Sequence, residues 1–414
     1  MTVRQRAEQA KAASRILARQ SRARKDAALA AIASGLLAER ARIEEANEAD
    51  VRRAEASGLG SALVERLILN GERIHALARA VEHVASLPDP VGSRSAMQRA
   101  PNGLYIGKQR LPLGLVAIVY ESRPNVTVDA AALTLKSGNA VLLRGGKEAA
   151  STNAVLVDVM RRALADKDLP EDAVCLVPPG DREEIRELCS LAGLVDLVIP
   201  RGGEALIRFV TEVARVPVIQ HYKGVCHLFL DESAELDMAL ALTVNAKVQR
   251  PGVCNALECL LVHERAVERL LPRIAEALVA EGVELRGCER ARAVVPSLRA
   301  ATEADFGAEF LAKILAIRVV DDLDGALLHV ERYGSNHSEA ICTSRLDHAE
   351  RWLAEVDASC VLVNASTRFN DGGELGLCAE MGISTSKLHA YGPMGLESLT
   401  AEKWIVMGEG QVRT

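Results

Sequence analysis

Cys254 stands in a stretch, residues 248–262, whose residue types could present a nucleophile. An Arg-Pro-Gly turn precedes the thiol, and an apolar run over 257–262 predicts a strand after it. A loop held between rigid elements can offer a side chain to a substrate without losing precision. Free cysteines are also common as small buried hydrophobes. The local sequence therefore leaves catalysis and packing both open.

Two glycine turns that follow predicted strands could bind the phosphates of a nucleotide. They are Arg144-Gly145-Gly146-Lys147 and Arg201-Gly202-Gly203. Glycine lets a phosphate approach the backbone, and the N–H groups and dipole of a following helix attract it. Neither turn has the pattern GxGxxG, so an ordinary turn between a strand and a helix stays open as the alternative.

The two cations of the first turn indicate which nucleotide would bind. A carboxylate near the ribose suits the free hydroxyl groups of NAD, whereas Arg144 and Lys147 suit a 2′-phosphate. We therefore expect NADPH/NADP, and no metal, as the cofactor. Solvated surface charge is the alternative for both side chains.

Three further polar residues could act on a substrate. Asn125 could donate its side-chain amide to a developing oxyanion, and Arg123 could bind a carboxylate or phosphate. His337, in a polar loop before a predicted strand, could bind an anion or shuttle protons. Each could instead make only local structural hydrogen bonds.

The composition excludes several classes of function. The chain of 414 residues has 49% hydrophobic residues, a net charge of −6 and no basic stripe, which argues against nucleic-acid binding. Residues 1–53 carry charges throughout, so they contain no apolar core of a signal peptide and no membrane span. We expect a cytoplasmic protein.

The nine cysteines are irregularly spaced, which indicates reduced thiols rather than a disulfide framework. Cys254 and Cys259 could suggest a metal pair. No second Cys or His pair follows at ligand spacing, so we expect no zinc site.

The first half of the chain predicts a doubly wound α/β domain after two or three N-terminal amphipathic helices. Residues 103–114 resemble a strand pair outside this domain, which we expect to form a contact between subunits. Continuous apolar strands then alternate with amphipathic helices, the pattern of a parallel sheet covered on both faces. The predicted strands are 115–120, 140–143, 173–177, 195–199 and 216–220, and the predicted helices are 126–136, 148–165, 182–192 and 204–214.

The second half predicts another α/β unit. A helix capped by Asp231 or Ser233 should run to about residue 247, and a second helix should cover 263–280. The tail includes an apolar run, 403–407, that could pair with the earlier hairpin, whereas 286–310 gives no clear assignment. The predicted strands are 257–262, 314–320, 339–343 and 360–363.

The order of these predicted elements, from the N-terminal helices to the C-terminal return, resembles that of the aldehyde dehydrogenase superfamily along nearly the whole chain. Four motifs narrow the resemblance to the gamma-glutamyl phosphate reductase family, also called glutamate-5-semialdehyde dehydrogenases. They are YESRPNVTVD at 120–129, LKSGNAVLLRGG at 135–146, QRPGVCN at 249–255 and AEMGIST at 379–385. In addition, the stretch 218–224 (VIQHYKG) lacks the glutamate with which hydrolytic aldehyde dehydrogenases activate water.

The resemblance implies three segments. Residues 1–227 would hold the N-terminal helices and the dinucleotide-binding domain, with the hairpin 101–114 as an oligomerisation element. Residues 228–365 would form a catalytic domain with the cysteine loop, and 366–414 a C-terminal return with an oligomerisation strand. We therefore expect a homo-oligomer and, as a possible partner, the glutamate 5-kinase that makes the substrate.

The resemblance also implies an activity in proline biosynthesis. Cys254 would attack L-glutamyl 5-phosphate, expel phosphate and form a thioester, which NADPH reduces to L-glutamate 5-semialdehyde. The Cys254 N–H and Asn125 would stabilise the oxyanion, and Arg123 and His337 would bind the anionic groups of the substrate. An NAD-linked hydrolytic aldehyde dehydrogenase and a cofactor-binding scaffold without catalysis are the alternatives.

Overall fold

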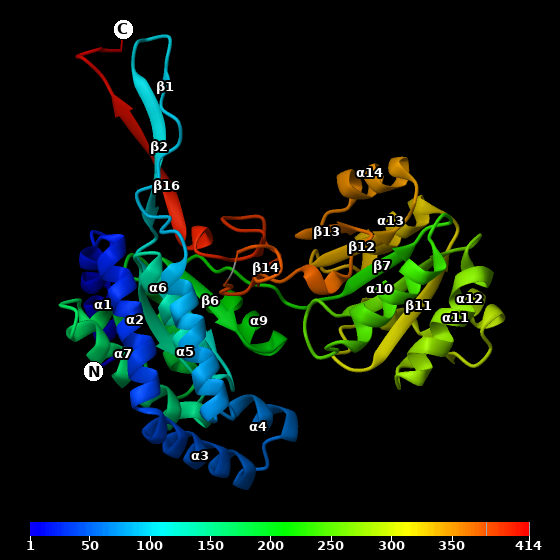
Figure 1. The fold of residues 1–414 in the computed structure, drawn as a ribbon, viewed down its shortest axis with the longest axis horizontal. Helices are drawn as coiled ribbons and strands as arrows, with labels where there is room; N and C mark the ends of the chain where they lie inside the picture. Colours follow the sequence, from blue (N-terminus) through cyan, green and yellow to red (C-terminus); the bar gives the residue numbers. More distant parts are fainter. Residues whose placement is uncertain (378, 414) are drawn as a thin grey trace. The chain divides into compact units, whose positions relative to one another are not determined.

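The structure, a computed structural model, describes residues 1–377 and 379–413 (Figure 1). It divides into two compact units. Unit 1 comprises Met1–Gln220, Leu377–Gly382 and Met394–Thr414, and unit 2 comprises His221–Gly376 and Ile383–Pro393. The functional division at residues 227 and 365 stays a prediction. Its last segment, 366–414, includes residues 378 and 414, which lie outside the described residues.

Five N-terminal helices open unit 1, where the sequence predicted two or three. Short polar breaks separate them: Ser21 caps the second helix by accepting from Arg24 N, and Asn70 caps the fifth by accepting from Arg73 N. The helix α1 packs on the parallel sheet of this unit, whereas α2 packs against the helices of the opposite face. The helices are α1 (Val3–Leu17), α2 (Arg22–Ala38), α3 (Arg40–Ala56), α4 (Ser61–Leu67) and α5 (Gly71–Ser86).

The centre of unit 1 is a four-stranded parallel sheet of order β5-β4-β3-β6, which confirms the doubly wound prediction. The central strand β3 pairs through Ile118 with Leu143 of β4 and with Ile199 of β6. The order reverses between β3 and β6, and such a switch point opens a crevice at the carboxyl ends of the strands. The elements are β3 (Leu115–Tyr120), α6 (Pro124–Lys136), β4 (Ala140–Arg144), α7 (Ala150–Ala165), β5 (Val174–Leu176), α8 (Arg182–Ser190), β6 (Leu197–Arg201) and α9 (Glu204–Val213).

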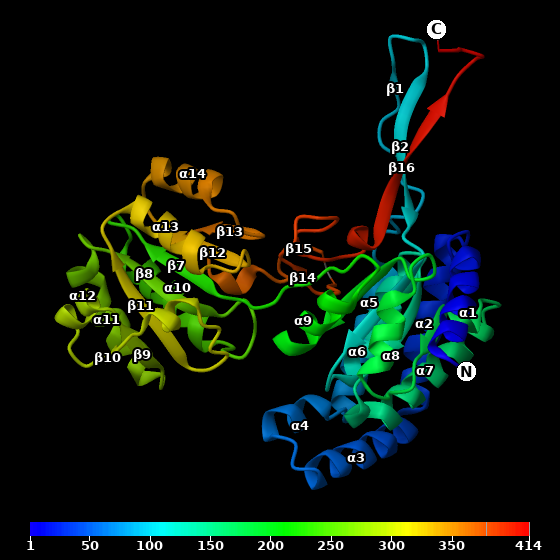
Figure 2. The same ribbon diagram turned by 180° about the vertical axis from the view of Figure 1, so that it is seen from behind.

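A β arm projects from this unit in both views (Figure 1, Figure 2). Residues 103–114 form one strand, β2 (Tyr105–Pro112), and not the predicted strand pair. Its main partner is β16 (Thr400–Met407), antiparallel from Thr400 opposite Pro112 to Met407 opposite Tyr105, while β1 (Gln98–Arg99) pairs over two residues. The predicted pairing of the C-terminal run with this region is thus confirmed.

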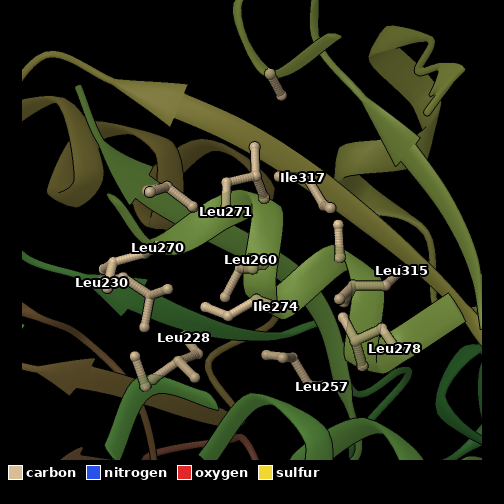
Figure 3. Packing of buried hydrophobic residues seen from close by; sticks show 14 of the residues in the cluster. Leu228, Leu230, Leu257, Leu260, Leu270, Leu271, Ile274, Leu278, Leu315 and Ile317 are labelled. Carbon is tan, nitrogen blue, oxygen red and sulfur yellow. The ribbon is translucent and has the colours of Figure 1, made fainter. Parts of the chain in front are cut away.

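Unit 2 is built on a seven-stranded parallel sheet of order β10-β9-β11-β8-β7-β12-β13. Leucine and isoleucine side chains of β7, β8, β11 and α11 meet on one face of it (Figure 3). On the other face, Phe229 and Ile341 pack with Trp352 of α14. The elements are β7 (Cys226–Leu230), α10 (Leu236–Val248), β8 (Leu257–His263), α11 (Val267–Ala280), β9 (Glu284–Gly287), α12 (Glu289–Val294), β10 (Arg299–Ala300), β11 (Ile314–Val320), α13 (Leu323–Tyr333), β12 (Ser338–Cys342), α14 (Leu346–Glu355), β13 (Cys360–Val363), β14 (Ile383–Ser384) and β15 (Gly392–Pro393).

Three predicted elements need correction. Residues 216–220 make only an isolated bridge, Val198 with Val218, because Pro217 has no N–H to donate to a ladder. The helix α10 begins at Leu236, since Asp231 binds the hydroxyl of Ser233 (2.6 Å) instead of capping a helix. The segment 263–280 divides at the end of β8, and its helix begins at Val267.

Among the described residues, no helix combines the length and the apolar composition that crossing a membrane requires.

Candidate active site

The thiol of Cys254 lies in the loop between α10 and β8, at the amino-terminal end of the parallel strand that follows it. A buried ion pair closes the base of this loop, because Lys247 Nζ lies 2.6 Å from Glu258 Oε2. Burial lowers the pKa of Lys247 and raises that of Glu258 to about 7, and the attraction between the two groups opposes both shifts. The second oxygen of Glu258 accepts from Leu311 N at 3.1 Å. The loop is therefore anchored at both ends.

The start of β7 supports the backbone of Cys254. A Cβ on Gly224 would lie 2.0 Å from the Cys254 carbonyl oxygen, so only glycine fits there. The thiol of Cys226 donates to the same oxygen at 3.1 Å. Burial raises the pKa of Cys226 well above its ordinary value, which keeps this thiol protonated and able to donate.

Two imidazoles converge on the Cys254 thiol. One ring nitrogen of His221, one of His337 and the sulfur of Cys254 all lie within 4.8 Å of one another. The half-buried His221 uses Nδ1 to contact the carbonyl oxygen of Ile383 at 3.1 Å. A carbonyl can only accept, so Nδ1 carries the proton and a neutral His221 has a lone pair on Nε2. His221 is therefore a candidate base for the Cys254 thiol.

Burial decides the protonation state of His337. It is fully buried, and burial lowers its pKa to about 3. The His337 imidazole is therefore neutral at neutral pH and a poor base. It can bind an anion only by donating a hydrogen bond from its N–H group. Its Nδ1 lies 2.8 Å from Ser338 Oγ, and its Nε2 has no hydrogen-bond partner among the described residues.

Arg368 interacts electrostatically with Cys254 and with a second arginine, Arg250. Burial lowers the pKa of Arg368, and the nearby Arg250 lowers it further, while Asp371 and the cysteines 254 and 226 oppose the decrease. Arg368 Nε also donates to Gln249 Oε1 at 2.9 Å. Positive charge close to a cysteine favours the thiolate.

In unit 1, polar residues that could act on a substrate follow the end of β3. Ser122 has a φ of 44° and donates both its N–H and its hydroxyl to Glu148 Oε1, at 2.6 and 2.8 Å. Such a left-handed conformation in a non-glycine residue is often found at functional sites. Next to it, the half-buried Arg123 occupies the position that caps α6.

Asn125 is exposed in the first turn of α6, and its side-chain amide donates to Asp129 Oδ2 at 3.0 Å. Burial raises the pKa of Asp129 to about 6, while the bond from Asn125 and the charge of Arg201 limit the increase. One N–H of the Asn125 amide remains for an oxyanion.

The first glycine turn is held by internal contacts. A Cβ on Gly145 would lie 2.3 Å from the Asn153 amide nitrogen and 3.0 Å from the Tyr120 ring. The buried Arg144 donates to the carbonyl oxygens of Gly145 (3.3 Å), Gly180 (3.1 Å) and Asp181 (3.4 Å), so its guanidinium ties the loops after β4 and β5 together. Lys147, by contrast, is exposed.

The second glycine turn lies at the switch point of the sheet. Gly203 N donates to Glu121 Oε2 at 3.1 Å, which joins the loops after β3 and β6. A Cβ on Gly202 would lie 2.5 Å from the same carboxylate oxygen, whereas no atom lies within 4 Å of a Cβ on Gly203. Space beside the N-terminus of α9 is thus available to a ligand.

The structure brings Cys254 and His337 together within unit 2, and it groups the other predicted site residues in unit 1. Sequence reasoning missed His221 and Arg368. His221 stands in the stretch whose only noted feature was its missing glutamate, and Arg368 comes more than a hundred residues after the thiol. No spacing rule connects either residue to Cys254.

Comparisons with known proteins agree on one family. The model of the aldehyde dehydrogenase family matches residues 1–285. Gamma-glutamyl phosphate reductase of Sorangium cellulosum is 60% identical, with 98% of this chain and 96% of that protein covered. The crystal structure of gamma-glutamyl phosphate reductase from Thermotoga maritima has a TM-score of 0.98 and 45% identity, with 100% of both chains covered. The chain therefore belongs to the aldehyde dehydrogenase family, among the gamma-glutamyl phosphate reductases.

Proposed function

We propose that the chain reduces L-glutamyl 5-phosphate to L-glutamate 5-semialdehyde and phosphate, with NADPH, through a thioester on Cys254. The observation that carries this proposal is the position of the Cys254 sulfur within 4.8 Å of ring nitrogens of His221 and His337. Relatives with the same name at 52–60% identity over nearly their full lengths support the choice of substrate. The step belongs to proline biosynthesis.

The first half of the reaction forms the thioester. His221 Nε2 accepts the proton of the Cys254 thiol, and the arginines 250 and 368 favour the resulting thiolate. The sulfur attacks the γ-carbonyl carbon, and the C–O bond to phosphate breaks. The Cys254 N–H stabilises the oxyanion. An N–H of His337 binds an anionic group of the substrate. For Asn125 and Arg123, the roles of oxyanion donor and anion-binding residue stay those that the family resemblance implies.

The second half is the reduction. Bound NADPH supplies the hydride that converts the thioester carbon to the aldehyde level. The C–S bond then breaks, the thiolate is regenerated, and the one proton that the overall reaction consumes is carried by the released phosphate. No carboxylate occupies residues 218–224, so that stretch offers no carboxylate base to activate water against the thioester.

The edge of the unit 1 sheet fits a dinucleotide. The pyrophosphate would lie in the open space at Gly203, at the N-terminus of α9 and beside Arg201 and Gly202, where it would replace the Glu121 carboxylate as the acceptor from Gly203 N. The exposed Lys147 would bind the 2′-phosphate, and Arg144 would hold the Gly145-Gly146 turn in shape. These roles follow from general dinucleotide recognition.

We also propose a homo-oligomer joined through the β arm, and transfer of the substrate from glutamate 5-kinase. The arm exposes large apolar side chains, Tyr105, Trp404, Val406 and Met407, of which Trp404 is 68% exposed. Exposed apolar side chains gathered on one arm mark a surface that another subunit can cover.

The reverse reaction tests substrate, cofactor and acceptor in one assay. Glutamate 5-semialdehyde should reduce NADP only when phosphate is present, and kcat/KM should be higher with NADP than with NAD. Phosphate-independent formation of glutamate would instead indicate the hydrolytic alternative. A clear preference for NAD would refute the role proposed for Lys147, which is binding of the 2′-phosphate.

A further inference from the structure

A second group of histidine and cysteine side chains lies in the core of unit 2, and it shares no residue with the Cys254 site. His227 on β7, Cys259 on β8 and His329 on α13 each offer one ligand atom, and these atoms all lie within 4.8 Å of one another. The first two side chains are completely buried, and His329 is 4% exposed. The sequence predicted no zinc site because no two ligand pairs stand at short spacing, whereas these three residues are far apart in the chain.

The hydrogen bonds of His227 leave one nitrogen for a further ligand. His227 Nδ1 lies 2.8 Å from Glu339 Oε2, which also accepts from His227 N at 3.0 Å. This bond places a proton on Nδ1, so Nε2 of a neutral His227 has a lone pair. His227 Nε2 is buried and makes no hydrogen bond with any described residue. A carboxylate bound to the far nitrogen of an imidazole is the usual support of a metal-binding histidine.

The spacing of the other two ligands suits a single metal ion. Cys259 Sγ lies 3.6 Å from His329 Nε2. Zinc bound at about 2.0–2.1 Å to nitrogen and about 2.3 Å to sulfur, with a tetrahedral angle between them, holds the two ligand atoms about 3.5 Å apart. Two imidazoles and a thiolate are also ligands that zinc prefers over magnesium or calcium.

We propose that His227, Cys259 and His329 bind a zinc ion. Binding displaces the proton of the Cys259 thiol to solvent, and sulfur then donates to the metal as thiolate. The two charges of zinc are balanced by this thiolate and by the Glu339 carboxylate, which leaves no net charge in the core. The remaining position of the tetrahedron takes a small ligand such as water.

The role of this zinc is structural. Its ligands join β7, β8 and α13, and Glu339 adds β12. These strands begin with the residues that position the Cys254 site: Cys226 opens β7, the Cys254 loop leads into β8, and Ser338, beside His337, opens β12. Zinc would therefore hold together the strands from which the site is built.

The competing account is a core without metal, in which the Cys259 thiol donates a hydrogen bond to His329 Nε2. Metal content separates the two. Protein produced with added zinc and purified without chelators should hold about one zinc per chain, because two imidazoles and a thiolate in a buried site bind zinc tightly. The variant Cys254→Ser should hold as much, which excludes metal bound between His221, Cys254 and His337.

Substitution of the proposed ligands should remove the metal. Cys259→Ser and His329→Gln should lose most of the zinc, while Cys342→Ser, which changes a buried cysteine of the opposite core, should keep it. Retention of zinc by Cys259→Ser together with loss by Cys254→Ser would overturn the proposal. So would wild-type protein that stays free of metal after incubation with zinc.

A spectroscopic measurement on protein that keeps all three proposed ligands does not depend on whether the ligand variants fold. X-ray absorption at the zinc edge of Cys254→Ser protein, whose core is unchanged, should show one sulfur neighbour together with the two imidazole nitrogens and the oxygen of the small ligand. A shell of oxygen and nitrogen without sulfur would contradict the assignment.

Discussion

At the scale of single residues, the thiol could be found in the sequence but its partners could not. Cys254 is marked by the turn before it and the strand after it, and its nucleophilic role stays a prediction. The structure adds that His221 and His337 flank it, although neither is near it in the chain. The burial of His337, which lowers its pKa to about 3, depends on tertiary packing, and no local pattern carries that information.

The role of His221 gives a residue-scale prediction. His221→Asn should keep a donor for the Ile383 carbonyl while removing the base. Loss of a general base lowers rates by about 10²-fold or more, so kcat should fall by about that factor. Alkylation of Cys254 by iodoacetamide should become slower at neutral pH, and its pH profile should move to higher pH.

The matched control is His389→Asn, which changes an exposed histidine of the same unit. It should leave alkylation and turnover unchanged. If the pH profile of Cys254 alkylation is the same in His221→Asn as in the wild type, His221 is not the base that activates the thiol.

At the scale of elements, apolar runs predicted most strands of the two parallel sheets, because buried parallel strands carry continuous hydrophobic residues. The strand 115–120 was predicted with its observed bounds, and so were 314–320 and 360–363. Errors arose where pairing is not local. The strand β2 finds its main partner almost three hundred residues later, and a sequence window around residues 103–114 cannot show that.

The open glycine at the N-terminus of α9 leads to a second prediction. Gly203→Ala adds a methyl group where the protein itself leaves space, so it should raise KM for NADPH by about tenfold, or about 1.4 kcal/mol of binding free energy. Gly60→Ala is the control, because Gly60 also precedes a helix and a Cβ added to it would also have no atom within 4 Å. Both variants should lose similar small amounts of stability. Equal KM values for the two would argue against phosphate binding at this turn.

The buried ion pair below the cysteine loop leads to a third prediction. Lys247→Met or Glu258→Leu alone leaves a buried charge without its partner, which should lower the free energy of unfolding by about 3–5 kcal/mol. The double variant removes both charges and should recover most of that loss. Urea denaturation measures all three proteins.

An exposed pair serves as the control for this measurement. Arg273 and Glu276 are 68% and 78% exposed, so Arg273→Ala should cost less than about 1 kcal/mol. A double variant as unstable as the sum of the single variants would contradict the proposed coupling.

At the scale of the whole molecule, the fold class was predictable because two signals agreed. Alternating strands and helices indicated a doubly wound domain followed by a second α/β unit, and four motifs indicated the family. The observed sheets confirm the α/β architecture. The compact units are interleaved, since residues 394–414 return to unit 1 after unit 2 is complete. Domain ranges that each consist of one continuous segment cannot describe a unit to which the chain comes back. The predicted domain ranges remain predictions.

The apolar edge of the β arm leads to a fourth prediction, on assembly. Val406→Lys places a charge on the arm, so the mass in solution measured by light scattering should fall from an oligomer towards a monomer. Val279→Lys changes a side chain of similar exposure, 58% against 55%, on α11 and should leave the mass unchanged. An unchanged mass for Val406→Lys would refute the role of the arm.

The central claim is that Cys254 carries the acyl group, and one measurement tests it most directly. Enzyme mixed with glutamate 5-semialdehyde and NADP without phosphate should form about one NADPH per active site in a burst and then stop, with the glutamyl group on Cys254 in the mass spectrum of the digest. Added phosphate should release the group and restore turnover. Cys254→Ala should show no burst, whereas Cys360→Ala should behave as wild type. Phosphate-dependent turnover without any acyl group on Cys254 would contradict the account.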